Sequence, residues 1–436
     1  MAKVTSNKTA FILLSVLFFL FGFITVLVDS LIPRLKELFT LSFFEAGLVQ
    51  FAFFGAYFLL SIPASYIISK IGYKGGIILG LITMAIGCSL FYPAASYRVF
   101  GVFLFGYFTL AAGMTVLQVA INPYIAVLGS EESAASRLTL SQAFNSVGTA
   151  IAPAVGALLI LSDKIKTKDE IAGLTEGARD LYYSAEASAV QSPFIGITIF
   201  ILAITSIFFF VRLPKLISEI DNTTYLSALK EKNLMLGVLG ILFYVGAEVA
   251  IGSYLVNYFL DMNLVETIKS TDFMRNICET FLRDGLESYD GKAIVGIFVT
   301  FYWLGAMIGR FVGSVLTNIF NPGVVISVFA SSAFALVVIS MNTSGLVAMW
   351  TILSVGLFNS IMFPTIFTMA LGGIKDLKPK GSGLLCTAIV GGALIPPIFG
   401  RCIDAFGFKI AFAVILCCYV YILFYGWRNA RKFVRD

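Results

Sequence analysis

The chain has 436 residues, of which 58% are hydrophobic and 13% are charged, with a formal net charge of +5 and a mean hydropathy of +0.93. Soluble domains carry roughly 25% charged residues, so this composition excludes an ordinary soluble domain and indicates a membrane protein. The sequence contains no histidine, which excludes histidine-ligated metal sites, Ser-His catalysis and histidine proton relays. The positive charge needs no nucleic-acid partner, because basic residues at membrane edges account for it.

Apolar segments recur along the chain, and each is long enough to cross a hydrocarbon core of about 30 Å as a helix. Continuous apolarity of this length predicts helices rather than barrel strands. We expect twelve spans, near 9–31, 44–69, 75–97, 99–128, 138–161, 194–213, 234–260, 293–317, 323–341, 347–371, 382–401 and 409–427. Two longer connections, 162–193 and 261–292, are predicted outside, and the second is expected to form short helices.

Basic residues in the short connections predict the orientation of the chain. With both termini in the cytoplasm, sixteen Lys and Arg residues fall inside and five fall outside. The sixteen are Lys3, Lys8, Lys70, Lys74, Arg137, Arg212, Lys215, Lys230, Lys232, Lys375, Lys378, Lys380, Arg428, Arg431, Lys432 and Arg435, and the five are Arg34, Lys36, Arg98, Arg401 and Lys409. We therefore expect a multi-pass protein of the cell inner (plasma) membrane with both termini cytoplasmic.

The two halves of the chain carry matching patterns, which indicates an internal duplication. The spacing G-x4-P-x2-G occurs at 148–156 and at 392–400, 244 residues later, and an amide precedes a proline by five residues at 118–123 and 359–364, 241 residues apart. We expect an all-α membrane protein with 12 transmembrane helices in two pseudo-symmetric six-helix bundles. The predicted parts are an N-terminal bundle (1–211), a charged cytoplasmic linker (212–232) and a C-terminal bundle (233–436), an architecture typical of transporters.

Two carboxylates lie within or at the end of predicted spans. Asp29 stands in TVLVDSLIPRL and Glu248 in YVGAEVAIGSYL. A carboxylate near a helix centre costs about 2.5–3.5 kcal/mol on insertion scales, so such residues usually mark a substrate or ion path. The alternatives are an interfacial pair between Asp29 and Arg34, and a purely structural role for Glu248.

Amides lie on one face of several spans. Gln118 and Asn122 are four residues apart and share a helix face, as do Gln142 and Asn145, which are three apart. Asn257 and Asn359 add amides in the second half. Amides both donate and accept hydrogen bonds, which suits a ligand with many hydroxyls, whereas the alternative is hydrogen bonding between helices.

The predicted span 293–317 carries a stripe of small residues, and two cysteines lie in predicted outer segments. Gly305, Gly309 and Gly313 form a GxxxGxxxG stripe typical of close helix packing, and the adjacent Arg310 is predicted to belong to a cytoplasmic gate. Cys278 and Cys402 both fall in predicted outer segments, where we favour free thiols over a disulfide. No catalytic residues and no metal site are predicted.

Several long segments together resemble the major facilitator superfamily, and within it the fucose–galactose–hexose symporter family, with the greatest similarity to its bacterial glucose/galactose transporter branch. They are LVDSLIPRL, FFEAGLVQFAFFGAYFLLSIPAS, LQVAINPYIAVLG, RLTLSQAFNSVG, FYVGAEVAIGSYLV and IMFPTIFTMALGGI. The resemblance implies uptake of a monosaccharide by alternating access, in a protein that works as a monomer.

The resemblance also assigns residues, with two departures. Asp29 matches the functional Asp in the first helix of the proton–fucose symporter, and the pair Gln142 and Asn145 matches its fifth-helix amides. Gln118 replaces the functional Glu of the fourth helix, whereas Glu248 stands where that symporter has Gln in the seventh. The acid has moved between helices, so the proton mechanism of that symporter does not transfer directly to this chain.

The predicted function is import of a hexose, with glucose, galactose and fucose as candidates, and with no cofactor besides H⁺ or Na⁺ as coupling ion. Substrate contacts are predicted for Gln118, Asn122, Gln142, Asn145, Glu248 and Asn359, and ion coupling for Asp29 and Glu248. A sugar uniporter and a drug/proton antiporter of the same fold are the alternatives. A receptor or scaffold is less favoured, because it has no reason to keep carboxylates inside spans, and an enzyme least, because no nucleophile–base pair is visible.

Overall fold

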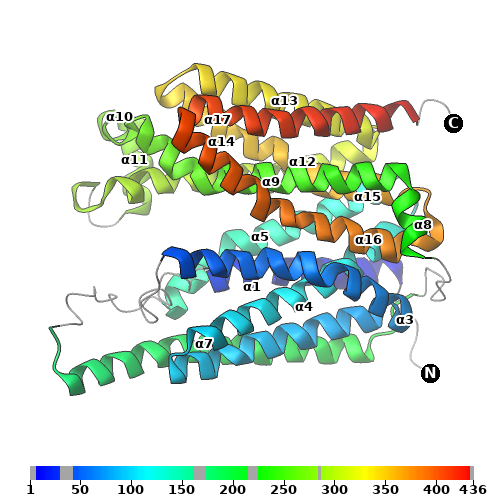
Figure 1. Cartoon of the computed structure of the whole chain (residues 1–436), viewed down its shortest axis with the longest axis horizontal. Coiled ribbons are helices and arrows are strands. Elements are labelled where there is room, and N and C mark those ends of the chain that lie inside the picture. The colour runs from blue at the N-terminus through cyan, green and yellow to red at the C-terminus, as the bar shows by residue number, and fades with distance from the viewer. Residues whose placement is uncertain (1–5, 30–42, 161–172, 215–223, 283–285, 433–436) are drawn as a thin grey trace. The chain divides into compact units, whose positions relative to one another are not determined.

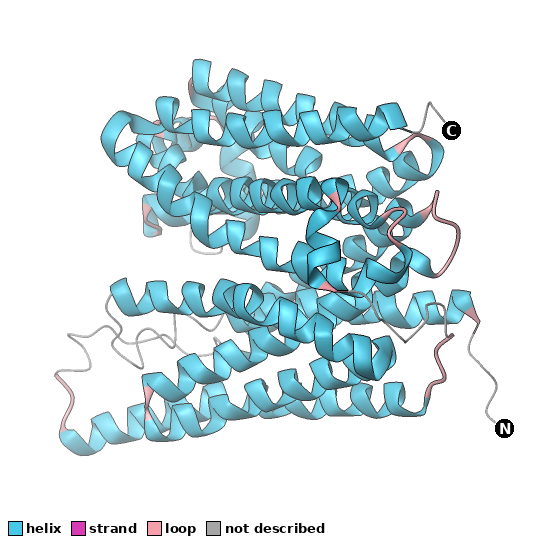
Figure 2. Ribbon diagram, turned by 45° about the vertical axis from the view of Figure 1, so that its right-hand side comes forward, coloured by secondary structure: helices cyan, strands magenta, loops and turns pink. Residues whose placement is uncertain are grey.

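The computed structural model describes residues 6–29, 43–160, 173–214, 224–282 and 286–432, and this part of the chain contains helices and no strand (Figure 2). The chain divides into two compact units, of which the first is 1–131, 144–231 and 371–388 and the second is 132–143, 232–370 and 389–436. The predicted bundle boundaries at 211 and 233 stay a prediction, because the units also include short segments from the opposite half of the sequence.

The first unit is built around the helices α3 and α4 (Figure 1). Its helices are α1 (Asn7–Asp29), α3 (Phe43–Tyr97), α4 (Phe100–Val127), most of α5 (Ala134–Ile160), α7 (Glu176–Phe210), α8 (Tyr225–Lys230) and α16 (Lys378–Thr387). Glycines allow α3 and α4 to approach closely, since a Cβ on Gly87 would lie 2.4 Å from the backbone nitrogen of Leu110 and one on Gly113 would lie 2.5 Å from that of Met84. This is the small-residue packing expected between membrane helices.

The second unit is built around α9 and α17 (Figure 1). Its helices are α9 (Lys232–Asp261), α10 (Leu264–Ser270), α11 (Asp272–Phe281), α12 (Gly291–Ile319), α13 (Pro322–Asn342), α14 (Gly345–Asn359), α15 (Met362–Leu371) and α17 (Gly391–Lys432). Helix α13 packs along α17 and on α14, and α14 packs on α12. Many side chains of these helices that face away from the unit are apolar and exposed, such as Val315 and Val420, as expected for surfaces that lipid covers.

The predicted spans are present as helices, and two pairs of them follow one another directly, with a kink at a glycine between the two spans. Helix α3 contains the second and third spans on either side of Gly72, and α17 turns in the same way at Gly407; both glycines have a φ of 77°, which favours glycine. Within the described residues nine helical stretches are long and apolar enough to cross a membrane, and two of them contain these kinks. Helix α5 provides the remaining predicted span.

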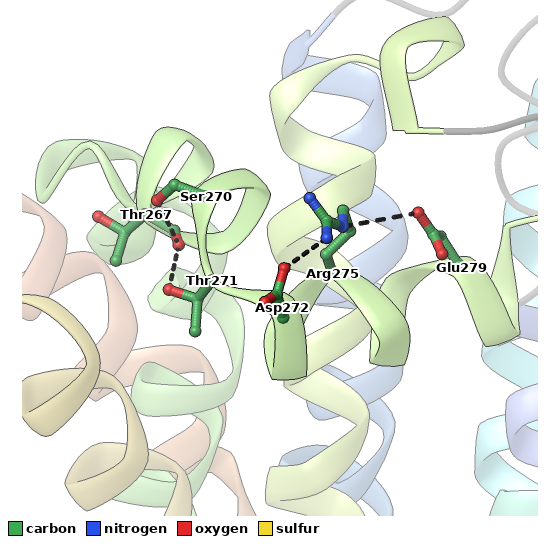
Figure 3. A network of polar contacts seen from close by, with 6 residues as sticks. All are labelled: Thr267, Ser270, Thr271, Asp272, Arg275 and Glu279. Carbon is green, nitrogen blue, oxygen red and sulfur yellow. Dashed lines mark hydrogen bonds and ion pairs between the residues drawn. The ribbon is translucent and has the colours of Figure 1, made fainter.

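Two connections differ in length or content from simple loops. Helix α7 begins at Glu176, so the predicted connection 162–193 is helical in its second part; the segment is rich in Ala, Glu and Leu, which favour helix without raising hydropathy. The prediction of short helices in 261–292 is confirmed by α10 and α11. Figure 3 shows that Arg275 pairs with Asp272 and Glu279, while the Thr271 hydroxyl donates to the Thr267 carbonyl at 2.7 Å.

Candidate functional site

The glycine stripe of α12 brings this helix against the end of α14. A Cβ on Gly309 would lie 2.2 Å from the Leu357 carbonyl oxygen, and one on Gly313 would lie 2.0 Å from the Ile361 side chain. The prediction of close packing along this stripe is therefore confirmed. The contact also sets Arg310, the residue after Gly309, beside the point at which α14 ends.

The tenth span is interrupted because of Pro364. Helix α14 ends at Asn359 and α15 begins at Met362. Since proline has no N–H, Pro364 leaves the carbonyl of Ser360, four residues earlier, without its helical donor. The Arg310 Nε donates to this carbonyl oxygen at 3.3 Å, and Arg310 Nη1 donates to the Gln142 carbonyl oxygen at 3.5 Å. One guanidinium thus joins α12, the helix break and the start of α5.

Glu248 lies in a buried polar cluster of the second unit. On α9 it is one turn from Tyr244, and it interacts electrostatically with the Tyr244 hydroxyl and with Arg310. Its Oε1 is buried and has no hydrogen-bond partner among the described residues. The carboxylate therefore has a nearby cation and a buried acceptor oxygen that has no hydrogen-bond partner among the described residues.

Asn359 lies in the same cluster with both ends of its amide occupied. Its Nδ2 donates to the Tyr302 hydroxyl at 2.8 Å, and the Tyr419 hydroxyl donates to its Oδ1 at 2.8 Å. All three side chains are fully buried. This network joins α12, α14 and α17, so the present contacts of Asn359 are interhelical, and a sugar contact would require one of them to open. Its predicted role in substrate binding stays a prediction.

Helix α4 of the first unit carries two amide side chains with buried, unpaired atoms. Asn122 is completely buried, and neither its Nδ2 nor its Oδ1 has a hydrogen-bond partner within the described part of the chain. The same is true of the Oε1 of Gln118, one turn earlier. An unpaired buried polar atom costs about 1–3 kcal/mol, so three of them on one helix face indicate a place for a polar ligand.

Helix α5 contributes amides with different environments. The Nδ2 of Asn145 donates to the Phe18 carbonyl oxygen of α1 at 3.0 Å, where Gly22 lets the two helices meet: a Cβ there would lie 2.2 Å from the Asn145 carbonyl oxygen. Asn145 therefore fixes α1 against α5. Gln142 belongs to the segment of α5 in the second unit, where its carbonyl accepts from Arg310. The predicted sugar contacts of both residues stay predictions.

A second proline-exposed carbonyl occurs at the equivalent position of the repeat. Pro123 leaves the carbonyl of Val119 without a helical donor, and the hydroxyl of Ser382 on α16 donates to it at 2.9 Å. Val119 and Ser360 are 241 residues apart, which is the repeat offset of their prolines. The sequence pattern showed the amides and prolines but not these donors, although a proline four residues after a position always frees that carbonyl.

The other residues singled out from the sequence are Asp29 and the cysteines Cys278 and Cys402. Asp29 is the last residue of α1, and its side chain lies outside the described residues, as does Arg34. Cys278 and Cys402 are free thiols. Among the described residues no group of three or more Cys, Asp or Glu side chains could hold a metal ion. The two polar clusters can thus bind hydroxyls and hold charge or a proton, but the side chains seen here form no nucleophile–base pair.

Comparisons with known proteins agree with this arrangement. The family model described as "Major Facilitator Superfamily" matches residues 14–389. A glucose/galactose transporter of Brucella abortus is 44% identical over 95% of this chain and 92% of its own, and an L-fucose-proton symporter of Escherichia coli K12 is 34% identical over 91% and 87%. The solved structure of the transporter FucP in the outward conformation superposes with a TM-score of 0.86 at 31% identity, covering 98% of this chain and 99% of that one.

Proposed function

We propose that this chain, which belongs to the Major Facilitator Superfamily, imports a hexose by alternating access and couples that movement to an ion gradient. The family and the relatives consist of transporters, not enzymes, and the chain is an integral membrane protein. The relatives are named for glucose, galactose and fucose, and at up to 44% identity over nearly the full length their substrate class is the best guide to this one.

The observation that carries the proposal is the unpaired amide pair on α4. Gln118 and Asn122 together have three buried polar atoms that form no hydrogen bond with any of the described residues. A sugar hydroxyl donates and accepts at once, so it can satisfy amide oxygens and nitrogens on the same face. A polyspecific drug pump gains less from such a face, because it recognises apolar and aromatic surfaces. The amides therefore support a sugar over a drug as the transported solute.

We propose that Asp29 and Glu248 couple sugar movement to the ion gradient, and that the two carboxylates have different main roles. Glu248 interacts electrostatically with the Arg310 guanidinium, and its Oε1 is buried without a hydrogen-bond partner among the described residues. We assign to Glu248 chiefly the binding of a sugar hydroxyl through its free Oε1, and to Asp29 chiefly the loading of H⁺ or Na⁺. A proton suits a single carboxylate, while Na⁺ requires additional oxygen ligands.

The proposal includes a gate and an orientation. Arg310 holds the exposed carbonyl of Ser360 and contacts the start of α5, so its release would free both helices to move during the transport cycle. The sixteen-to-five distribution of basic residues supports both termini in the cytoplasm and location in the inner (plasma) membrane. We further propose that the monomer is the transporting unit, as the resemblance implies.

Counterflow in proteoliposomes tests the substrate. Proteoliposomes that hold the purified full-length protein are loaded with unlabelled glucose, galactose, fucose or mannose. The entry of the same sugar in labelled form is then followed without an ion gradient. Transient accumulation of one or more hexoses is expected, and is expected to fall at least about tenfold in Gln118→Ala. Absence of counterflow for every hexose, together with export of cationic dyes that is driven by an inward proton gradient, would instead favour the antiporter.

A further inference from the structure

A cavity of about 520 Å³ lies entirely within the second unit, between the end of α9 and the part of α17 around its kink at Gly407. Its polar and aromatic lining consists of Tyr254, Asn257, Asp261, Arg401, Asp404 and Phe408. The volume falls within the roughly 300–1,000 Å³ typical of small-molecule sites. None of these residues belongs to the polar clusters described above, so the cavity is a separate feature.

The wall of this cavity depends on the repeated G-x4-P-x2-G motif, of which Pro397 and Gly400 both line it. A Cβ on Gly400 would lie 2.2 Å from the Tyr254 hydroxyl, so glycine is what lets this tyrosine lie against α17. The Tyr254 ring also packs edge-on against Phe399, with centroids 5.5 Å apart. The tyrosine is thereby held as one fixed, partly exposed aromatic side of the cavity.

The polar groups of the cavity are not engaged with one another. Asn257, Asp261, Arg401 and Asp404 are exposed, and within the described part of the chain their side chains form no hydrogen bond or ion pair. Arg401 thus lines the same cavity as two carboxylates without pairing with either. Donors and acceptors of both kinds are therefore available to a molecule that enters.

We propose that this cavity is a second hexose-binding site, separate from the amides of α4. Carboxylates and an amide accept from neighbouring sugar hydroxyls, a guanidinium donates to them in a fixed fork, and a tyrosine ring offers a flat face to the sugar ring. A metal cation fits less well, because the positive charge of Arg401 repels it and no group of three or more Cys, Asp or Glu side chains among the described residues could hold a metal ion. A neutral polyol satisfies the groups of both charges at once.

The inference rests on the proposed function, since it takes the transported solute to be a hexose. In the proposed orientation, the end of α9 at Asp261 and the turn at Gly407 both lie on the outer side of the membrane. A sugar bound there is held by the protein before it reaches the amides of α4. The site therefore raises the local concentration of substrate and lowers the sugar concentration that half-saturates transport, without altering the maximal rate.

Equilibrium binding of labelled galactose and glucose to the full-length protein in lipid nanodiscs tests the site, with counterflow measured in parallel. Two bound sugars per chain are expected for the natural sequence. Arg401→Ala and Asp404→Asn each weaken one of the two sites by about tenfold or more, since each removes a charged hydrogen-bonding partner. Both residues are exposed, so the variants are expected to fold, and Lys409→Ala removes the positive charge of another exposed residue that does not line the cavity, as a control for Arg401→Ala.

The outcomes separate this inference from the proposed function. One sugar per chain, or two sugars whose binding Arg401→Ala and Asp404→Asn leave unchanged, overturns the second site while counterflow continues. Absence of both hexose binding and counterflow overturns the proposed function itself. Loss of one site in these two variants but not in Lys409→Ala, with an unchanged maximal counterflow rate and a higher half-saturating concentration, supports the inference.

Discussion

The Arg310 Nε donates to the carbonyl oxygen of Ser360, which is the carbonyl that Pro364 leaves without a helical partner. A side chain from one helix thus replaces a backbone hydrogen bond of another, at the point where the tenth span is broken. The arrangement has an equivalent in the first half, where the Ser382 hydroxyl donates to the Val119 carbonyl. A bond of this kind can be exchanged during a conformational change, whereas a regular helical bond cannot be exchanged without unwinding.

Replacing Arg310 in two ways separates its charge from its geometry. Arg310→Lys keeps a cation beside Glu248 but loses the planar fork that reaches Ser360 and Gln142, whereas Arg310→Ala loses both. We expect Arg310→Ala to abolish counterflow and to lower the melting temperature strongly, because it leaves Glu248 without a cation. Arg310→Lys is expected to keep sugar affinity within about threefold but to change the counterflow rate. Equal behaviour of the two variants in both assays would contradict the gating role.

A double-mutant cycle tests the link between Arg310 and the helix break. Pro364→Ala restores an N–H that can bond to the Ser360 carbonyl, so the Arg310 contact becomes redundant. The destabilisation caused by Arg310→Lys should then shrink by about 1 kcal/mol in the Pro364→Ala background. The measurement is thermal or denaturant unfolding of the four purified proteins in one detergent. Additive effects would show that the two residues do not share this carbonyl.

Much of this arrangement could be predicted from the sequence, but the donors could not. Apolar length predicted the spans, and glycine spacing predicted the contact between α12 and its neighbour, because both depend on local composition. The partner of Ser360 depends on which residue of α12 faces the break, which only the tertiary contact at Gly309 determines. The same limit applies to Asn359: its position was predicted, whereas its two tyrosine partners come from α12 and α17.

Removing an unpaired buried amide should weaken binding without weakening the fold. Asn122→Leu is expected to reduce hexose affinity by about tenfold, while the melting temperature of the sugar-free protein stays the same or rises, since an unsatisfied polar group is replaced by an apolar one. Thr115→Ala on the same helix is the control, because its hydroxyl is already bonded to the Ala111 carbonyl at 2.8 Å. A large loss of stability in Asn122→Leu with unchanged affinity would assign Asn122 to packing.

The thiol of Cys278 provides a test of the outer helices. Burial, and secondarily the neighbouring Glu279 carboxylate, raises the pKa of this thiol above its ordinary value. The thiolate fraction at neutral pH is therefore small, and maleimide labelling of Cys278 should be slower than that of the partly exposed Cys402 and should accelerate as the pH rises. The rates are compared in variants that retain one cysteine each. Labelling of the unmodified chain at both positions only after reduction would contradict free thiols.

Site residues were harder to predict than helices, because polar atoms in a membrane protein serve packing and binding alike. Asn145 and Gln118 look equivalent in sequence, yet Asn145 already bonds to the Phe18 carbonyl while the Oε1 of Gln118 is unpaired among the described residues. The cavity beside Arg401 could not be predicted from the sequence. The G-x4-P-x2-G motif in its wall indicated only a repeat, and its charged residues indicated only the edge of a membrane.

Gradient-driven uptake tests the central claim, that the chain is an ion-coupled hexose importer. Proteoliposomes holding the natural sequence or Asp29→Asn receive labelled galactose, with an inward proton gradient and an inward Na⁺ gradient imposed separately. We expect accumulation above the external concentration under one of the two gradients, and expect Asp29→Asn to lose accumulation while it retains exchange of sugar. Uptake that stops at the external concentration under both gradients would contradict coupling and leave a uniporter.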